Sequence, residues 1–191
     1  MTNLQYAYAL VVIYYCSEAY NALSRWSDKK TDKAAGKADK GSIYVLGGAM
    51  TLSIILSIIV ALLTASWMGT VPLIPALGAA VFFFGLFFRW YSIRHLGKFF
   101  TVQVAISDDH RVIDTGPYKY IRHPSYTGGL LMCLGLGMCL ANPISISILL
   151  LLPFVSFLWR MNIEEAALQT ALGDSYAIYS SRTKRLIPFI Y

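Results

Sequence analysis

Charge is what this sequence has least of. Only 14% of its 191 residues are Asp, Glu, Lys or Arg, whereas a soluble domain usually carries ~25%. Because 57% of the residues are hydrophobic, the chain has too little polar surface to cover a fold in water. The composition therefore excludes an ordinary soluble domain. It favours an integral membrane protein that forms one domain over residues 1–191.

Cysteines and common site motifs are also scarce. Cys16, Cys133 and Cys139 lie in apolar segments without paired or metal-ligand spacing, so we expect reduced side chains that serve packing. The sequence contains no Walker loop, GxGxxG, nucleophile elbow or metal-ligand cluster. The first apolar run lacks the basic region and the small-residue cleavage site of a signal peptide. No metal site and no cleaved leader are therefore expected.

Long apolar runs are what the chain has in abundance, close to the ~20 residues that a bilayer requires. They predict an all-α fold with five transmembrane helices at residues 4–23, 42–68, 73–90, 125–141 and 144–159. Asn142-Pro143 is a strong turn signal, so the last two spans should form a helical hairpin. Glu18 is a charge near one end of a span; such a charge is often functional, but its place near the end favours a role in helix packing or at the interface, and the alternative stays open. Arg89 and Trp90 are expected to be interfacial anchors.

The sixteen Lys and Arg residues indicate the orientation of these spans. They fall within residues 24–42, 89–122 and 160–191, and none lies in the N-terminal tail or in the turns at 69–72 and 142–143. By the positive-inside rule, the N-terminus lies outside, and the polar segments and the C-terminus face the cytoplasm of a multi-pass protein. The net charge of +6 thus describes a membrane face in contact with lipid, not a nucleic-acid site.

The main polar passage, residues 108–126, ends in a sequence that opens a helix. Pro124 disfavours a helical conformation for His123 and suits the first turn of a following helix. Free backbone N–H groups at such a helix start can hold an anion. The simpler alternative is that Arg122 reaches the lipid headgroups and His-Pro merely starts a helix.

A second polar cluster follows the last span. Arg160 and Glu164 are four residues apart, so on a helix they share one face. They form either an ordinary ion pair or two sites that hold different charged groups of a ligand. Leu168 and Leu172 continue this helix as an amphipathic stretch, and Gly173 is its expected C-cap.

Taken together, these pieces resemble the isoprenylcysteine carboxyl methyltransferase family, which belongs to a wider group of membrane methyltransferases that includes phospholipid N-methyltransferases. The resemblance covers about residues 103–191. It is carried by GPYKYIRHPSYTGGLL, then Asn142-Pro143, then Arg160 with Glu164-Glu165, then GDSYAIYSSRTKRLIPFI.

The resemblance implies an S-adenosylmethionine site on the cytosolic side, capped by the polar loop and the C-terminal amphipathic helix. The residues it implies for the cofactor are Gln103, His110, Arg111, Val112, Ile113, Tyr118, His123, Pro124, Ser125, Tyr126 and Glu164. Glu164 would hold the methionine ammonium group, and Arg160 would face the methyl acceptor. Arg111 stands where the eukaryotic enzymes usually have a smaller polar residue.

The acceptor that this resemblance favours is the carboxylate of a prenylcysteine-like molecule, reaching the site sideways from the bilayer. A carboxylate is ionised at pH 7 and needs no general base, and Arg160 could hold it bidentately. The first alternative is N-methylation of a phospholipid or another hydrophobic amine, with Glu165 as the base. A small transporter or channel subunit, or a purely structural membrane protein, are the alternatives from other classes. The spans carry almost no charge and no internal repeat, which disfavours a transporter. The natural acceptor and the oligomeric state stay open.

Overall fold

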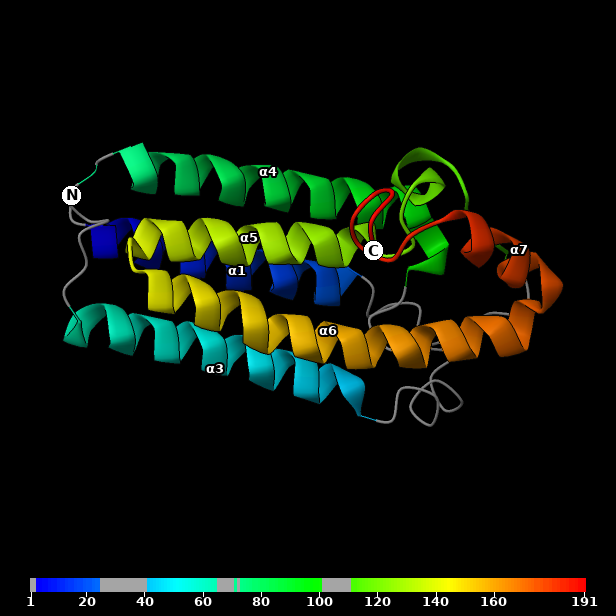
Figure 1. The fold of residues 1–191 in the computed structure, drawn as a ribbon, viewed down its shortest axis with the longest axis horizontal. Coiled ribbons are helices and arrows are strands. Elements are labelled where there is room, and N and C mark those ends of the chain that lie inside the picture. Colours follow the sequence, from blue (N-terminus) through cyan, green and yellow to red (C-terminus); the bar gives the residue numbers. More distant parts are fainter. Residues whose placement is uncertain (1–2, 25–40, 65–70, 72, 101–110) are drawn as a thin grey trace.

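The fold is a bundle of long helices with a polar cap at one end (Figure 1). A computed structural model describes residues 3–24, 41–64, 71, 73–100 and 111–191. Among these residues every regular element is a helix, and the one pairing of extended backbone is an isolated parallel bridge between Ile121 and Lys184. The elements are α1 (Asn3–Ser24), α3 (Ser42–Leu63), α4 (Leu73–Leu96), η3 (Gly97–Phe99), η4 (Gly116–Lys119), α5 (Pro124–Leu140), α6 (Pro143–Leu172) and α7 (Asp174–Arg182).

α5 lies at the centre of the bundle. It packs against α4, α6 and α1, while α3 packs mainly along α6. Successive long helices alternate in direction, so the end of α1, the start of α3, the end of α4 and the start of α5 share one end of the molecule (Figure 1). The polar segment 111–123, α7 and residues 183–191 lie at this same end. The bundle therefore gathers both polar clusters on one side.

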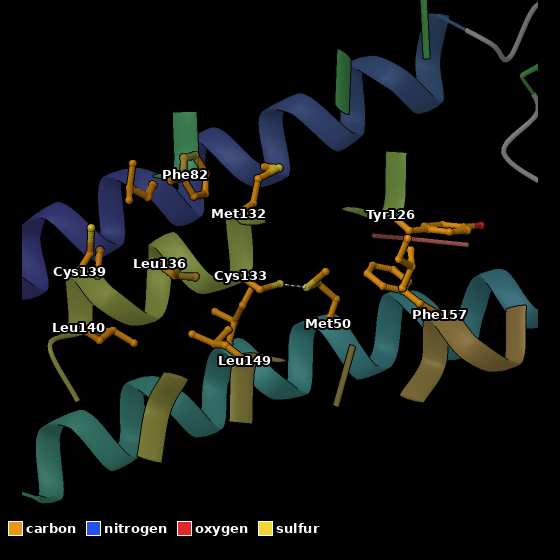
Figure 2. Packing of buried hydrophobic residues seen from close by; sticks show 14 of the residues in the cluster. Met50, Phe82, Tyr126, Met132, Cys133, Leu136, Cys139, Leu140, Leu149 and Phe157 are labelled. Carbon is orange, nitrogen blue, oxygen red and sulfur yellow. Dashed lines mark hydrogen bonds between the residues drawn. The ribbon is translucent and has the colours of Figure 1, made fainter. Parts of the chain in front are cut away.

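Glycines let α4 and α5 approach closely. A Cβ added at Gly135 would lie 2.4 Å from the Phe82 nitrogen, and one at Gly128 would lie 2.8 Å from the Arg89 Cβ. No side chain fits at these distances, so Gly128 and Gly135 allow the two helix backbones to lie in close contact. Cys133 and Cys139 are buried, and the Cys133 thiol lies 3.6 Å from the Met50 sulfur (Figure 2).

Three described helices are long and apolar enough to cross a membrane, namely Ser42–Leu63, Leu73–Phe99 and Pro143–Leu172, and α5 is a shorter apolar helix. The hairpin of α5 and α6 is confirmed. Asn142 caps α6 by accepting hydrogen bonds from the Ile144 and Ser145 nitrogens, at 3.0 and 3.1 Å, and Pro143 occupies the first turn. This is the arrangement that Asn and Pro favour at a helix start.

Some expected boundaries were wrong. The second span was predicted to reach residue 68, but α3 ends at Leu63 and Thr64 is extended. The third was predicted to end at residue 90, but α4 continues to Leu96. We expected Arg89 to mark the membrane boundary of this span because it is charged. Its side chain is instead turned inward and paired with Glu18. Cys16, expected to pack, is exposed.

Candidate functional site

His123 is held at a corner between α5 and the C-terminal segment 183–191. Pro124 starts α5, so His123 stays outside the helix with φ −124° and ψ 57°. The Arg122 and His123 nitrogens donate to the carbonyl oxygens of Lys184 and Arg185, at 2.7 and 3.0 Å. The imidazole is only 6% exposed. The local sequence therefore holds His123 in a fixed and buried position. It does more than start α5, which was the simpler alternative.

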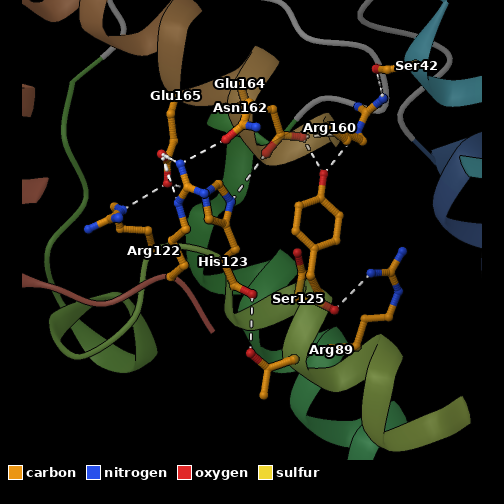
Figure 3. Close-up of polar contacts among 12 residues, drawn as sticks. Ser42, Arg89, Arg122, His123, Ser125, Arg160, Asn162, Glu164 and Glu165 are labelled. Carbon is orange, nitrogen blue, oxygen red and sulfur yellow. Dashed lines mark hydrogen bonds and ion pairs between the residues drawn. The ribbon is translucent and has the colours of Figure 1, made fainter. Parts of the chain in front are cut away.

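Two consecutive carboxylates of α6 lie on either side of this imidazole (Figure 3). Its Nδ1 is 3.4 Å from the Glu164 Oε2, and its Nε2 is 3.0 Å from the Glu165 Oε1. Burial alone would lower the pKa of His123, but hydrogen bonds and charges from both carboxylates outweigh this effect and leave its pKa raised above 6.5. The imidazole is therefore positioned to carry a proton between two anions.

Glu165 is fully engaged in holding this corner together. Arg122 donates its Nε to the Glu165 Oε1 at 3.0 Å, and the Arg185 Nη2 lies 2.6 Å from the Oε2. Arg122 also donates to the carbonyl oxygens of Ser180 and Thr183, at 2.8 and 2.6 Å. Two guanidinium groups stabilise the ionised form of Glu165. Glu165 is thus a clamp between α6 and the C-terminal segment, and a weak proton acceptor.

Arg160 is the buried cation of the site, with 3% of its surface exposed. Its Nε donates to the Tyr126 hydroxyl at 2.9 Å and to the Glu164 Oε1 at 3.1 Å, and its Nη1 donates to the Ser42 hydroxyl at 2.8 Å. The Tyr126 hydroxyl in turn donates to Glu164. The predicted Arg160–Glu164 pair is present, as one part of a network that joins α6 to α5 and to the start of α3 (Figure 3).

A cavity of about 450 Å³ lies beside this network, within the size range of small-molecule sites. The residues predicted for the cofactor or acceptor that line it are Arg111, Val112, Ile113, Tyr118, His123, Ser125, Tyr126, Arg160 and Glu164. Pro124 is fully buried, and neither Pro124 nor Glu165 lines the cavity. Gln103 and His110 lie outside the described residues.

The cavity has one polar and one apolar part. Towards α7 it is bordered by Glu164, Tyr176 and Tyr179. The part that we call apolar is bordered by α1 and α3, through Tyr14, Tyr15, Ile43, Leu46, Gly47, Met50 and Thr51. Glu18 and Asn21 of α1 also line the cavity. Such a cavity suits a ligand that has both a charged group and an apolar group.

Several lining residues could not be identified as site residues from the sequence alone. Tyr176 and Tyr179 come from α7, and Glu18 and Arg89 come from α1 and α4. The Tyr179 hydroxyl donates to the Tyr118 carbonyl oxygen at 2.9 Å. Only Glu18 gave a signal, as a charge in an apolar span. In the described part of the chain, no group of three or more His, Cys, Asp or Glu side chains could hold a metal ion.

Comparisons with known proteins give matches to one family of methyltransferases. The model of the isoprenylcysteine carboxyl methyltransferase (ICMT) family matches residues 76–170. The chain is 35% identical over 108 residues to the protein-S-isoprenylcysteine O-methyltransferase of Schizosaccharomyces pombe, covering 56% of this chain and 46% of that protein. It is 30% identical over 115 residues to protein-S-isoprenylcysteine O-methyltransferase B of Arabidopsis thaliana, covering 59% and 58%.

A solved structure is similar as well. The eukaryotic intramembrane Ras methyltransferase ICMT superimposes with a TM-score of 0.63 at 29% identity, covering 74% of this chain and 51% of that one. The chain thus spans about half the length of the proteins it matches. In sequence over residues 76–170 and in fold over 74% of its length, the chain is similar to the isoprenylcysteine carboxyl methyltransferase family.

Proposed function

We propose that this protein transfers a methyl group from S-adenosylmethionine to a lipophilic acceptor, the carboxylate of a prenylcysteine-like molecule. The observation that carries the proposal is the two-part cavity, in which His123, Tyr126, Arg160 and Glu164 border a polar part that adjoins an apolar part between α1 and α3. A donor with an ammonium and a nucleoside suits the first part, and a prenyl chain suits the second.

The chemistry of the lining residues fits this cofactor. Glu164 presents a carboxylate to the cavity, which suits the ammonium of the methionine portion. Tyr176 lines the same part, and its buried hydroxyl has no partner within the described residues, so a polar group of a ligand would satisfy it. When bound, the cofactor supplies an activated methyl group on a sulfonium.

The side chains of the site would act mainly by positioning. Arg160 lies between Tyr126, Glu164 and Ser42 at the border of the two parts, where a guanidinium can orient an acceptor carboxylate. Because Arg160 is only 3% exposed, little water reaches its guanidinium, which strengthens these interactions. No base is needed, because a carboxylate is already ionised at pH 7.

The same geometry disfavours the amine alternative. A protonated amine would need a base, and Glu165, the predicted candidate, is clamped by Arg122 and Arg185 and does not line the cavity. The buried cation Arg160 would also repel an ammonium. We therefore retain the carboxylate as the acceptor.

We further propose that α1, α3, α4, α5 and α6 are the five spans, with the cavity on the cytoplasmic side. α5 has 17 residues, which corresponds to about 26 Å of helix, close to the ~30 Å of a bilayer core. Single cysteines introduced at Asn3 and Ser181, after replacement of the native cysteines, should react with an impermeant maleimide from opposite sides of sealed vesicles. Labelling from one side alone would contradict this topology.

Calorimetry with S-adenosylhomocysteine tests the cofactor site on detergent-purified protein. Wild type should bind, and Glu164→Gln should weaken binding by roughly 10- to 150-fold, the worth of one charged hydrogen bond. Asp114→Asn is the matched control, because this exposed carboxylate pairs with Arg182 away from the cavity. Transfer of a labelled methyl group to a prenylcysteine analogue, compared with a phosphatidylethanolamine analogue, tests the acceptor. A wild-type protein that binds no cofactor would overturn the proposal.

A further inference from the structure

A second ion pair, which is partly buried, borders the cavity from the side of α1. Glu18 accepts hydrogen bonds from the Arg89 Nε and Nη2, at 2.8 and 2.9 Å, so that the carboxylate and the guanidinium meet in a fork. The two side chains are 29% and 13% exposed, and both line the cavity. A charge within a span is costly and commonly marks a functional site. This pair has no part in the chemistry proposed above.

Arg89 also reaches the corner that carries His123. Its Nη1 donates to the Ser125 carbonyl oxygen at 3.0 Å, in the first turn of α5 (Figure 3). The contact depends on the close approach of α4 and α5, since a Cβ at Gly128 would lie 2.8 Å from the Arg89 Cβ. One guanidinium therefore connects α1, through Glu18, to the residues directly after His123.

This geometry fixes the direction of the guanidinium. An arginine held by two bonds to one carboxylate cannot rotate without losing both. The third bond, to Ser125, is made by the same rigid planar group. Movement of Glu18 would therefore move the Arg89 donor away from the Ser125 carbonyl, which lies two residues from His123.

We propose that Glu18 is a positioning residue of the methyl-transfer site, which holds Arg89 on the Ser125 carbonyl and thereby fixes the corner bearing His123 and Tyr126. The inference rests on the proposed function. It assigns a role to α1, which lies outside residues 76–170 that match the family model. The simpler alternative is that the pair only holds α1 against α4.

A neighbouring hydrogen bond provides a matched control. The Trp90 Nε1 donates to the Ser17 hydroxyl at 2.7 Å and likewise joins α4 to α1, but neither residue lines the large cavity. Ser17→Ala should lower the unfolding temperature while affinity for S-adenosylhomocysteine stays at the wild-type level. Glu18→Gln should weaken that affinity by roughly ten- to a hundredfold and lower kcat/KM with it, because small displacements of positioning groups have effects of this size.

The charge-swapped double variant Glu18→Arg with Arg89→Glu separates the two roles. It restores an ion pair between α1 and α4, but a carboxylate at position 89 cannot donate to the Ser125 carbonyl. We expect the unfolding temperature to recover and the cofactor affinity to remain low. Arg89→Lys is a second variant, for the case in which the charge-swapped protein does not fold. Lysine keeps the positive charge but cannot make the two parallel hydrogen bonds of the guanidinium. It should keep near-wild-type stability with weakened cofactor binding.

Recovery of both stability and affinity in the swapped variant would overturn the inference and leave a purely structural pair. Equal losses of affinity in Glu18→Gln and Ser17→Ala would overturn it too. Neither result touches the proposed function, which fails only if the wild-type protein binds no cofactor or transfers no methyl group.

Discussion

Gly47 offers a direct test of where the acceptor tail binds. It lines the apolar part of the cavity on α3, and a Cβ added there meets no atom within 4 Å. Gly48 is equally open but does not line the cavity. Gly47→Leu should therefore place a branched side chain in the space proposed for the tail, whereas Gly48→Leu makes the same chemical change on another face of the helix.

The expected magnitude follows from the methylene groups displaced. A leucine side chain occupies the space of about three tail methylenes, each worth ~0.8 kcal/mol on burial. The loss is then about 2.4 kcal/mol, or about 60-fold in kcat/KM. An acceptor whose tail is too short to reach Gly47 should lose nothing. The cavity is about 450 Å³, so the substitution narrows it without filling it.

Methyl transfer to thioether acceptors of increasing chain length measures this effect. The Gly47→Leu penalty should grow with tail length, and Gly48→Leu should behave as wild type. Affinity for S-adenosylhomocysteine should be unchanged in both, since Gly47 belongs to α3, whereas Glu164 and Tyr176 belong to α6 and α7. A penalty that is independent of tail length, or equal in the two variants, would refute the placement of the tail between α1 and α3.

Three further predictions concern stability. Gly135→Ala should destabilise the bundle by about 1–3 kcal/mol through overpacking, whereas Gly48→Ala should not destabilise it. Equal unfolding temperatures of the two variants would contradict the close contact of α4 and α5 at Gly135. Because the pKa of folded His123 is raised above 6.5 by Glu164 and Glu165, its protonated form stabilises the fold at low pH, and this contribution is lost as the pH rises through the raised pKa. Unfolding temperatures between about pH 6 and pH 9 should fall in wild type and change less in His123→Gln. Glu165→Gln should cost about 1–3 kcal/mol and expose residues 183–191 to limited proteolysis; an unchanged cleavage pattern would argue against the clamp.

The sequence predicted those features of the fold that depend on residues close together in the chain. The hairpin was predictable because Asn142 and Pro143 have strong preferences at a helix start, and the structure places them there. The pairing of Arg160 with Glu164 followed from helical spacing. Gly173 was expected as the C-cap of the same helix, and it occupies that position with φ 53°. All three depend on residues within a turn or two of one another.

Contacts between distant segments were not predictable in this way. The pairing of Glu18 with Arg89 spans 71 residues and depends on how α1 and α4 face each other. The attachment of Lys184 to Ile121 likewise joins segments with no pattern in common. A positively charged residue at the end of an apolar run is most often a membrane boundary, which is why Arg89 was misjudged. The roles of the cofactor residues stay predictions.

The unbroken course of α6 has a consequence for the surrounding lipid. Its 30 residues correspond to about 45 Å, whereas a bilayer core is about 30 Å thick. Arg160, Glu164 and Glu165 all belong to this one helix, so a change in its tilt moves them together relative to His123. Bilayer thickness alters the tilt of long helices. We therefore expect the proposed methyl transfer in reconstituted vesicles to vary with acyl-chain length, so that the thickness of the host membrane would regulate it. Constant turnover across lipids would exclude this effect.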